Sequence, residues 1–142
     1  MHDVTVKWIF FLLLVMAGKA AMAEGITSPD GNLRLDFVVN SSGEPVYRLS
    51  YKNKAVVNPS KLGLELQDDL GLMDGFTLVE AKTSTFDATC KPVWGDVAQI
   101  RNHYNEQVVR LVPKEQDRHI VIRSRLYDVG LGFFSEFPLQ HV

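Results

Sequence analysis

A glutamate close to the end of the chain, Glu136, has the surroundings that most suggest chemistry. It lies in the sequence FFSEFP, residues 133–138, in which phenylalanines flank a single carboxylate. Side chains two residues apart share a face of a strand, so Glu136 is expected to point away from Phe133 and Phe137. A carboxylate at the end of a rigid strand could bind a metal ion or a substrate. The simpler interpretation is a carboxylate that is solvated or paired across a hairpin.

Residues 94–106 combine aromatic and polar side chains and form a second candidate site. The ring of Trp94 or Tyr104 could stack on the face of a pyranose, and Asn102 could hydrogen-bond the sugar hydroxyl groups. These three residues are therefore the predicted substrate contacts. The alternative interpretation is a loop whose Asn and Asp side chains hydrogen-bond their own backbone.

The segment that carries Glu136 is predicted to be a pair of strands. Two apolar-rich runs within residues 120–138 flank a turn that contains Asp128 and Gly130. One face of the first run is apolar and is expected in a core, whereas the opposite face carries Arg123 and Arg125.

The rest of the chain is predicted to form further short strands separated by turns. Residues 33–39 alternate apolar and polar side chains, and so do residues 47–52, which predicts a hairpin. Further strands are expected at residues 55–57, 62–66 and 76–82, and a loop or an edge at residues 83–92. No segment after residue 23 shows sustained helical periodicity, so the predicted fold class is all-β, an antiparallel β-sandwich.

Residues 1–23 are predicted to be a signal peptide that does not belong to the fold. Lys7 precedes an apolar run that is short for a membrane span, and Ala21-Met22-Ala23 has the small residues of a cleavage site. The protein is therefore expected in the periplasm or the medium, with no membrane association after cleavage. An uncleaved signal anchor is the alternative.

Composition and charge narrow the classes of partner. Removal of 23 residues from the 142 leaves 119, which suits one domain with a modest core. This segment has 13 basic and 16 acidic residues, and because the basic ones are scattered, no nucleic-acid partner is expected. Cys90 is the single cysteine, which excludes an internal disulfide and a cysteine metal site. It is expected to be buried or half-buried.

Four ordered blocks of the sequence carry a family resemblance. They are SPDG at 28–31, the strand at 47–51 followed by SKLGL at 60–64, Trp94-Gly95 with RNHYNE at 101–106, and residues 127–138. Together they resemble the amino-terminal domain of glycoside hydrolase family 97, which comprises exported bacterial α-glucosidases and α-galactosidases. The resemblance extends over essentially all of the chain after residue 23.

The resemblance implies a fold, a partner and a cofactor. It implies that the chain is the front part of a β-super-sandwich that packs against a catalytic (β/α)8 barrel. It also implies that the full-length protein acts on an α-linked oligosaccharide. It also implies that Glu136 is a calcium ligand, with the other ligands outside this chain. Phe134 and Ser135 stand where the family usually has an Arg-Tyr pair, and Val129 stands where a second acidic residue is common.

The two catalytic carboxyl groups of a glycoside hydrolase are not expected in this chain. The family takes them from the barrel, which needs about 250 residues. We therefore predict that the chain alone is inactive, and that residues 24–142 are an incomplete, non-catalytic sandwich of a longer hydrolase. The alternative is a stand-alone exported sandwich that acts as a carbohydrate-binding or interaction module.

Overall fold

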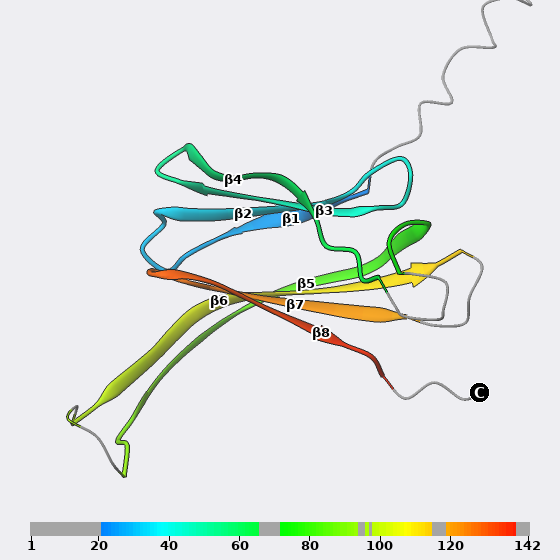
Figure 1. Cartoon of the computed structure of the whole chain (residues 1–142). Coiled ribbons are helices and arrows are strands. Elements are labelled where there is room, and N and C mark those ends of the chain that lie inside the picture. Colours follow the sequence, from blue (N-terminus) through cyan, green and yellow to red (C-terminus); the bar gives the residue numbers. More distant parts are fainter. Residues whose placement is uncertain (1–20, 66–71, 94–95, 97, 115–118, 139–142) are drawn as a thin grey trace, which may run out of the picture.

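Antiparallel strands in two layers make up the described part of the chain, as the alternating sequence pattern predicts. The computed structural model describes residues 21–65, 72–93, 96, 98–114 and 119–138. In these residues eight strands form two four-stranded sheets that face each other (Figure 1). This arrangement confirms the predicted all-β class and antiparallel sandwich. Among the described residues we find no helix with the length and apolarity needed to span a bilayer.

The first sheet is a meander with the order β1-β2-β3-β4. Its strands are β1 (Ala21–Thr27), β2 (Leu33–Val39), β3 (Pro45–Tyr51) and β4 (Lys54–Lys61). The hairpin predicted from residues 33–39 and 47–52 is confirmed as β2 and β3, with Phe37 opposite Tyr47. Inward-facing side chains of β2 are buried and alternate with more exposed ones, because one face of the sheet covers the core.

The second sheet is also a meander, with the order β5-β6-β7-β8. Its strands are β5 (Phe76–Cys90), β6 (Ile100–Pro113), β7 (Ile120–Tyr127) and β8 (Gly130–Glu136). The last two confirm the strand pair predicted around Asp128 and Gly130. In β7 the predicted apolar face is buried, and Arg123 and Arg125 lie on the outer face.

The core lies between the inner faces of both sheets. Phe37 and Leu35 of β2 are fully buried against the second sheet, which contributes Val109, Leu111 and Leu126. Burial of each such side chain stabilises the fold by about 1.5–3 kcal/mol relative to exposure. The two layers therefore depend on each other for their apolar cover.

A polar side chain also links the two layers. Gln107 of β6 is fully buried, and its Nε2 donates a hydrogen bond to the backbone carbonyl of Glu24 in β1. A buried amide contributes to stability only when such bonds are made, so this contact fixes β1 against β6.

The chain crosses from the first sheet to the second through residues 62–75. The predicted strand at 62–66 is reduced to a single bridge between Leu64 and Leu72 in the described residues. The crossover approaches the β2–β3 turn closely, because Phe76 N–H donates to the carbonyl of Gly43. Gly43 has φ +78°, and a Cβ there would lie 2.6 Å from the Phe76 nitrogen, so only glycine fits without displacement.

The distal half of the β5–β6 hairpin projects from the sandwich; it decides between two predicted alternatives and corrects two predictions. Residues 86–90 and 100–104 pair only with each other, because β7 begins its pairing with β6 at Asn105; we call these two segments the arm. Residues 83–90 are an edge strand, one of the two predicted alternatives. The loop interpretation of residues 101–106 is wrong, since they are part of β6. Cys90 is exposed rather than buried, because it lies at the end of the arm beyond the core.

The predicted signal peptide falls mostly outside the described residues, which begin at residue 21. Its last three residues, Ala21, Met22 and Ala23, belong to β1 and pair with residues 37–39 of β2. Ala23 is buried in the core cluster. These three residues are thus part of the sandwich in this structure.

Candidate functional site

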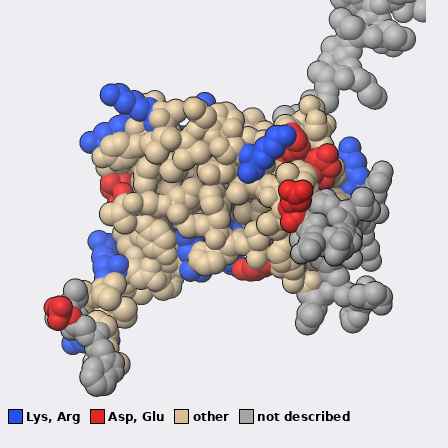
Figure 2. Space-filling view, viewed as in Figure 1, with Lys and Arg blue, Asp and Glu red and all other residues tan. Residues whose placement is uncertain are grey.

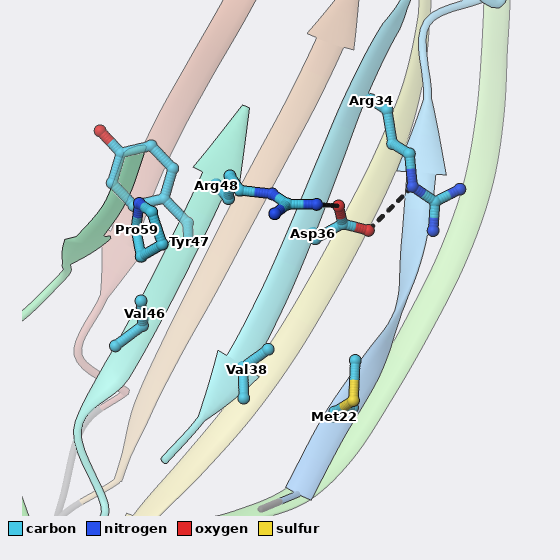
Figure 3. A pocket seen from close by; sticks show the side chains of 8 residues that line it. All are labelled: Met22, Arg34, Asp36, Val38, Val46, Tyr47, Arg48 and Pro59. Atoms are coloured by element: carbon cyan, nitrogen blue, oxygen red, sulfur yellow. Dashed lines mark hydrogen bonds and ion pairs between the residues drawn. The ribbon is translucent and has the colours of Figure 1, made fainter. Parts of the chain in front are cut away.

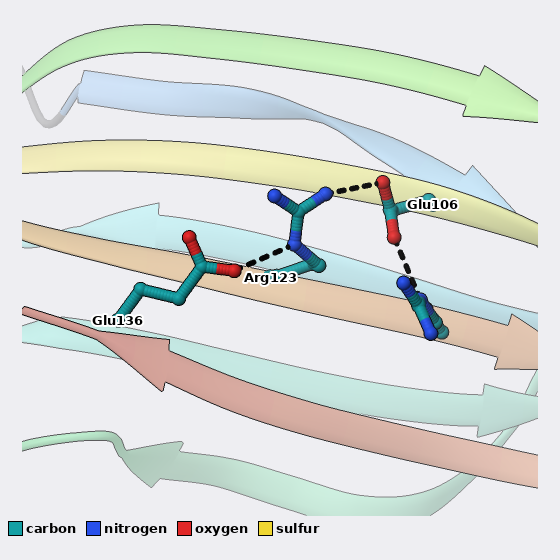
Figure 4. Close-up of polar contacts among 4 residues, drawn as sticks. Glu106, Arg123 and Glu136 are labelled. Carbon is teal, nitrogen blue, oxygen red and sulfur yellow. Dashed lines mark hydrogen bonds and ion pairs between the residues drawn. The ribbon is translucent and has the colours of Figure 1, made fainter.

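Glu136 lies at the end of β8, on the outer face of the second sheet. Its Oε1 accepts a hydrogen bond from Arg123 Nε of the neighbouring strand β7 at 2.9 Å, and the carboxylate is about half exposed (Figure 4). The geometry is that of a carboxylate paired across a hairpin, the simpler of the two sequence interpretations. Arg123 fixes the direction in which the Glu136 side chain points.

The same arginine reaches a second, more buried carboxylate in β6. Arg123 Nη1 donates to Glu106 Oε1 at 2.7 Å, and Arg125 Nε donates to Glu106 Oε2 at 2.7 Å. The Glu106 side chain is only 10% exposed. Burial by itself raises the pKa of Glu106, but the hydrogen bonds from Arg125 and Arg123 outweigh it and leave the pKa below the ordinary value. Both oxygens of Glu106 are therefore held as an ionised acceptor.

Aromatic rings surround this ionic network. Tyr104 is 7% exposed, and its ring is covered by Phe86, stacked at 5.2 Å, and by Tyr127 at 5.2 Å. The Arg125 guanidinium lies between the rings of Tyr104 and Phe134, at 4.8 and 5.1 Å from their centroids. We call the whole set the outer cluster; it consists of Phe86, Tyr104, Glu106, Arg123, Arg125, Tyr127, Phe134 and Glu136.

Two of the three predicted sugar contacts, Asn102 and Tyr104, lie within the described residues. Trp94 lies outside the described residues. Asn102 is exposed on the arm, opposite Ala88. Tyr104 lies two residues further on the same face of β6, but its ring is covered by its neighbours, and the more exposed ring of that stack is Phe86.

The sequence interpretation missed the centre of the cluster, Glu106. Neither interpretation of residues 101–106, a sugar-contacting surface or a loop, assigned them to a strand, so no face could be assigned to Glu106. The alternation of Tyr104, Glu106 and Val108 was the available signal, because it matches the alternation of Arg123, Arg125 and Tyr127 on the paired strand.

The described residues do not by themselves form a metal centre. They contain no group of three or more His, Cys, Asp or Glu side chains placed to hold a metal ion. Calcium takes about six to eight oxygen ligands. Glu136 has an exposed carboxylate at a strand end and so fits the role of a single ligand, with the remaining ligands coming from elsewhere.

A separate hollow of the described surface lies on the first sheet. It has a volume of about 440 Å³, and Met22, Val38 and Val46 form its apolar part (Figure 3). Beside them Asp36 is paired with Arg34 at 2.9 Å and with Arg48 at 3.7 Å. Asp36, a carboxylate in its lining, is thus already engaged by two arginines.

Two of the sequence blocks that carry the family resemblance meet at one end of the sandwich. The backbone N–H of Asp30, in the turn between β1 and β2, donates to Asp128 Oδ1 in the turn between β7 and β8 at 2.8 Å. The Asp30 carboxylate is itself held by the Ser28 hydroxyl, which together with Asn32 lowers the pKa of Asp30 to about 2. The SPDG block therefore has a structural role, since it links the two layers.

Charge is dispersed over the surface seen in Figure 2. Basic and acidic side chains are interspersed on that face of the described residues rather than gathered into one charged band. The outer cluster differs from this pattern because its charges are paired and partly buried.

Comparisons with known proteins agree on one family. A family model described as "Glycosyl-hydrolase 97 N-terminal" matches residues 26–142. A glycoside hydrolase family 97 enzyme from Pseudoalteromonas sp. strain K8, solved in complex with panose and with acarbose, superimposes with a TM-score of 0.77 at 27% identity. A β-arabinopyranosidase superimposes with a TM-score of 0.73 at 20% identity and shows the fold alone. The match covers 82% of this chain but only 18% of each of these relatives.

Proposed function

The chain belongs to glycoside hydrolase family 97, and from that premise we propose that it is the amino-terminal, non-catalytic sandwich of an exported α-glycosidase. The observation that carries the proposal is the family match over residues 26–142. The catalytic carboxyl groups would come from a barrel that this chain does not contain, because the chain spans about a fifth of its solved relatives.

The substrate class we propose is an α-linked oligosaccharide. Support comes from the family 97 relative that was solved with panose and with acarbose. Among the two specificities that the resemblance implies, panose favours the α-glucosidase, since it is a glucose oligosaccharide. The role of this chain would be to pack against the barrel and to place side chains such as Glu136 at the edge of the barrel.

Glu136 is the residue that we propose as a calcium ligand. The family resemblance suggests the role, and the exposed carboxylate at the end of β8 is compatible with it. Bound calcium would supply positive charge that polarises an oxygen of the substrate. The contribution of this chain would be to orient Glu136, which Arg123 does through its hydrogen bond to Oε1.

Hydrolysis by the native protein tests the function. The protein purified from its source should release glucose from panose. An absence of hydrolysis on panose and on α-galactosides would contradict the assignment. Sugar binding without hydrolysis would instead support a stand-alone carbohydrate-binding module.

Calcium binding tests the role of Glu136 separately. Glu136→Gln in the native protein should weaken calcium binding by about tenfold or more, as measured by calorimetry after chelation. Glu44→Gln is the matched control, because Glu44 is also a surface carboxylate paired with one cation, Lys61. Equal calcium affinity in the two variants would show that Glu136 serves only its ion pair with Arg123.

A further inference from the structure

We propose that Glu106 is a positioning residue for the calcium ligand Glu136 and that it acts through Arg123. The proposal rests on the proposed function, because it takes Glu136 as a ligand of calcium, and it goes beyond it by naming the residue that holds this ligand ready. The three side chains lie in a row across β6, β7 and β8 on the outer face of the second sheet (Figure 4).

The strand register puts Arg123 between the two carboxylates. Glu106 of β6 is paired with Arg125, and Glu136 of β8 is paired with Val121. Arg123 lies midway between these two positions of β7, so it is a diagonal neighbour of both carboxylates. Diagonal neighbours on one face of a sheet are within reach of long side chains. The register therefore lets one guanidinium bind both carboxylates.

The donors of Arg123 are divided between its two partners. Its Nε donates to Glu136 Oε1 at 2.9 Å, and its Nη1 donates to Glu106 Oε1 at 2.7 Å. An arginine can also bind one carboxylate through two parallel hydrogen bonds, which occupy both oxygens. The bond to Glu106 fixes the plane of the guanidinium, and Arg123 holds Glu136 by Oε1. Oε2 of Glu136 therefore stays available for a metal ion.

Glu106 is the fixed end of this series of contacts. Its other oxygen, Oε2, accepts a hydrogen bond from Arg125 Nε at 2.7 Å, and the Arg125 guanidinium lies between two aromatic rings. The exposed fraction of the side chains rises outward, from 10% for Glu106 to 28% for Arg123 and 48% for Glu136. The buried end therefore restrains the exposed end, which a ligand can reach.

A carboxylate that is held by one oxygen suits a metal ligand. Carboxylates that bind metal ions are themselves commonly held by hydrogen bonds from a second set of residues. A side chain that is already oriented loses less entropy when its ligand binds. Glu44 of the first sheet shows the contrast, because its two oxygens accept hydrogen bonds from Lys61 and Asn40. Glu136 has the orientation without the second bond.

Calcium titration of the native protein after chelation tests the proposal. Glu106→Gln should weaken calcium binding by about fivefold or more, because Arg123 then loses its anchor. Asp36→Asn is the matched control, since Asp36 is also a carboxylate that pairs with two arginines on the outer face of a sheet. This control should bind calcium as the wild type does. Equal affinity in Glu106→Gln and Asp36→Asn would overturn the proposal.

A double-mutant cycle separates positioning from the charge of Glu106. Arg123→Lys keeps the positive charge but lacks the planar fork that binds two carboxylates in fixed directions. Because Glu106 acts through Arg123, Glu106→Gln should change the calcium affinity by less than about twofold in the Arg123→Lys background. The same loss of affinity in both backgrounds would show that the charge of Glu106 attracts the ion directly, and would overturn the proposal.

Glu136→Gln distinguishes this proposal from the proposed function. Weaker calcium binding in Glu136→Gln together with wild-type affinity in Glu106→Gln would leave the ligand role in place and overturn the positioning role. Wild-type affinity in both variants, or no calcium binding by the wild type, would overturn both. The variants are compared well below their unfolding temperatures, where circular dichroism shows each to be folded, so that lost stability does not count as lost affinity.

Discussion

Each sheet has on its outer face a carboxylate that pairs with two arginines, but the two carboxylates differ in how deeply they are buried. Asp36 of the first sheet is 22% exposed and pairs with two arginines at 2.9 and 3.7 Å. Glu106 of the second sheet is 10% exposed and pairs with two arginines at 2.7 Å each. The arginines that pair with Asp36 are more than half exposed, whereas Arg125 beside Glu106 packs against two aromatic rings and Arg123 is held by a second carboxylate, Glu136.

The difference shows that composition alone does not identify a functional face. Both faces carry a carboxylate paired with two arginines, but among the described residues it is Glu106 of the second sheet that is the more buried, with aromatic rings on both sides of Arg125. Solvent-exposed pairs contribute about 0–1 kcal/mol, whereas breaking a buried pair is far more costly. The ion pairs on the outer face of the second sheet are therefore expected to contribute more to stability than those on the first.

The largest effect is expected in the core that the two sheets share. Phe37→Ala should lower the free energy of unfolding by about 3–5 kcal/mol, because Phe37 is fully buried and the substitution leaves a cavity. Phe134→Ala on the outer face should cost less than about 1 kcal/mol, mainly from the lost contact with Arg125. Urea titration measures both, and equal losses would show that Phe134 is part of a core.

The second effect separates the two carboxylates directly. Glu106→Ala should cost about 2–3 kcal/mol, since it leaves Arg123 and Arg125 without their shared acceptor. Asp36→Ala should cost about 0.5 kcal/mol, because its arginines are solvated. Similar values for the two variants would remove the distinction between the faces.

The third effect is a pH dependence that belongs to Glu106. Its pKa is lowered in the folded chain from the ordinary value of 4.5, so the folded state binds protons less readily than the unfolded state. The stability advantage of the wild type over Glu106→Gln should therefore be complete above pH 4.5 and should shrink as the pH falls through the folded pKa. Urea titrations between about pH 3 and 7 measure it, and a constant difference would contradict the lowered pKa.

The smallest effect is expected in the arm. Asp87 and Arg101 form two hydrogen bonds there, at 2.8 and 2.7 Å, but both side chains are exposed. Arg101→Ala should cost less than about 0.5 kcal/mol in the free energy of unfolding. A loss as large as that of Glu106→Ala would mean that the arm is part of the cooperative core.

Sequence reasoning succeeded where apolar and polar residues alternate. The strands at residues 33–39 and 120–127 were predicted because their inner side chains line a core, and the alternation records that burial. The cross-strand pairing that Glu136 makes with Arg123 was one of the two alternatives.

It failed where a strand lacks a buried face. The first part of β6, residues 100–103, was not predicted as a strand. These residues lie beyond the core, so they lack the alternation of buried apolar and exposed polar side chains that identifies a strand. Glu106 was missed for a related reason, since its burial comes from rings on β5, β7 and β8 that only the strand register brings together. The predicted roles of Trp94, Asn102, Tyr104 and Glu136 remain predictions.

The intact mass of the native gene product tests the central claim most directly. If this chain is the amino-terminal sandwich of a family 97 hydrolase, the protein isolated from its source should have a mass several times the 16.0 kDa of this chain. Its amino-terminal peptides should match the residues described above. A native mass of 16.0 kDa or less would contradict the account, because a protein of that size is too small to include a catalytic barrel of about 250 residues.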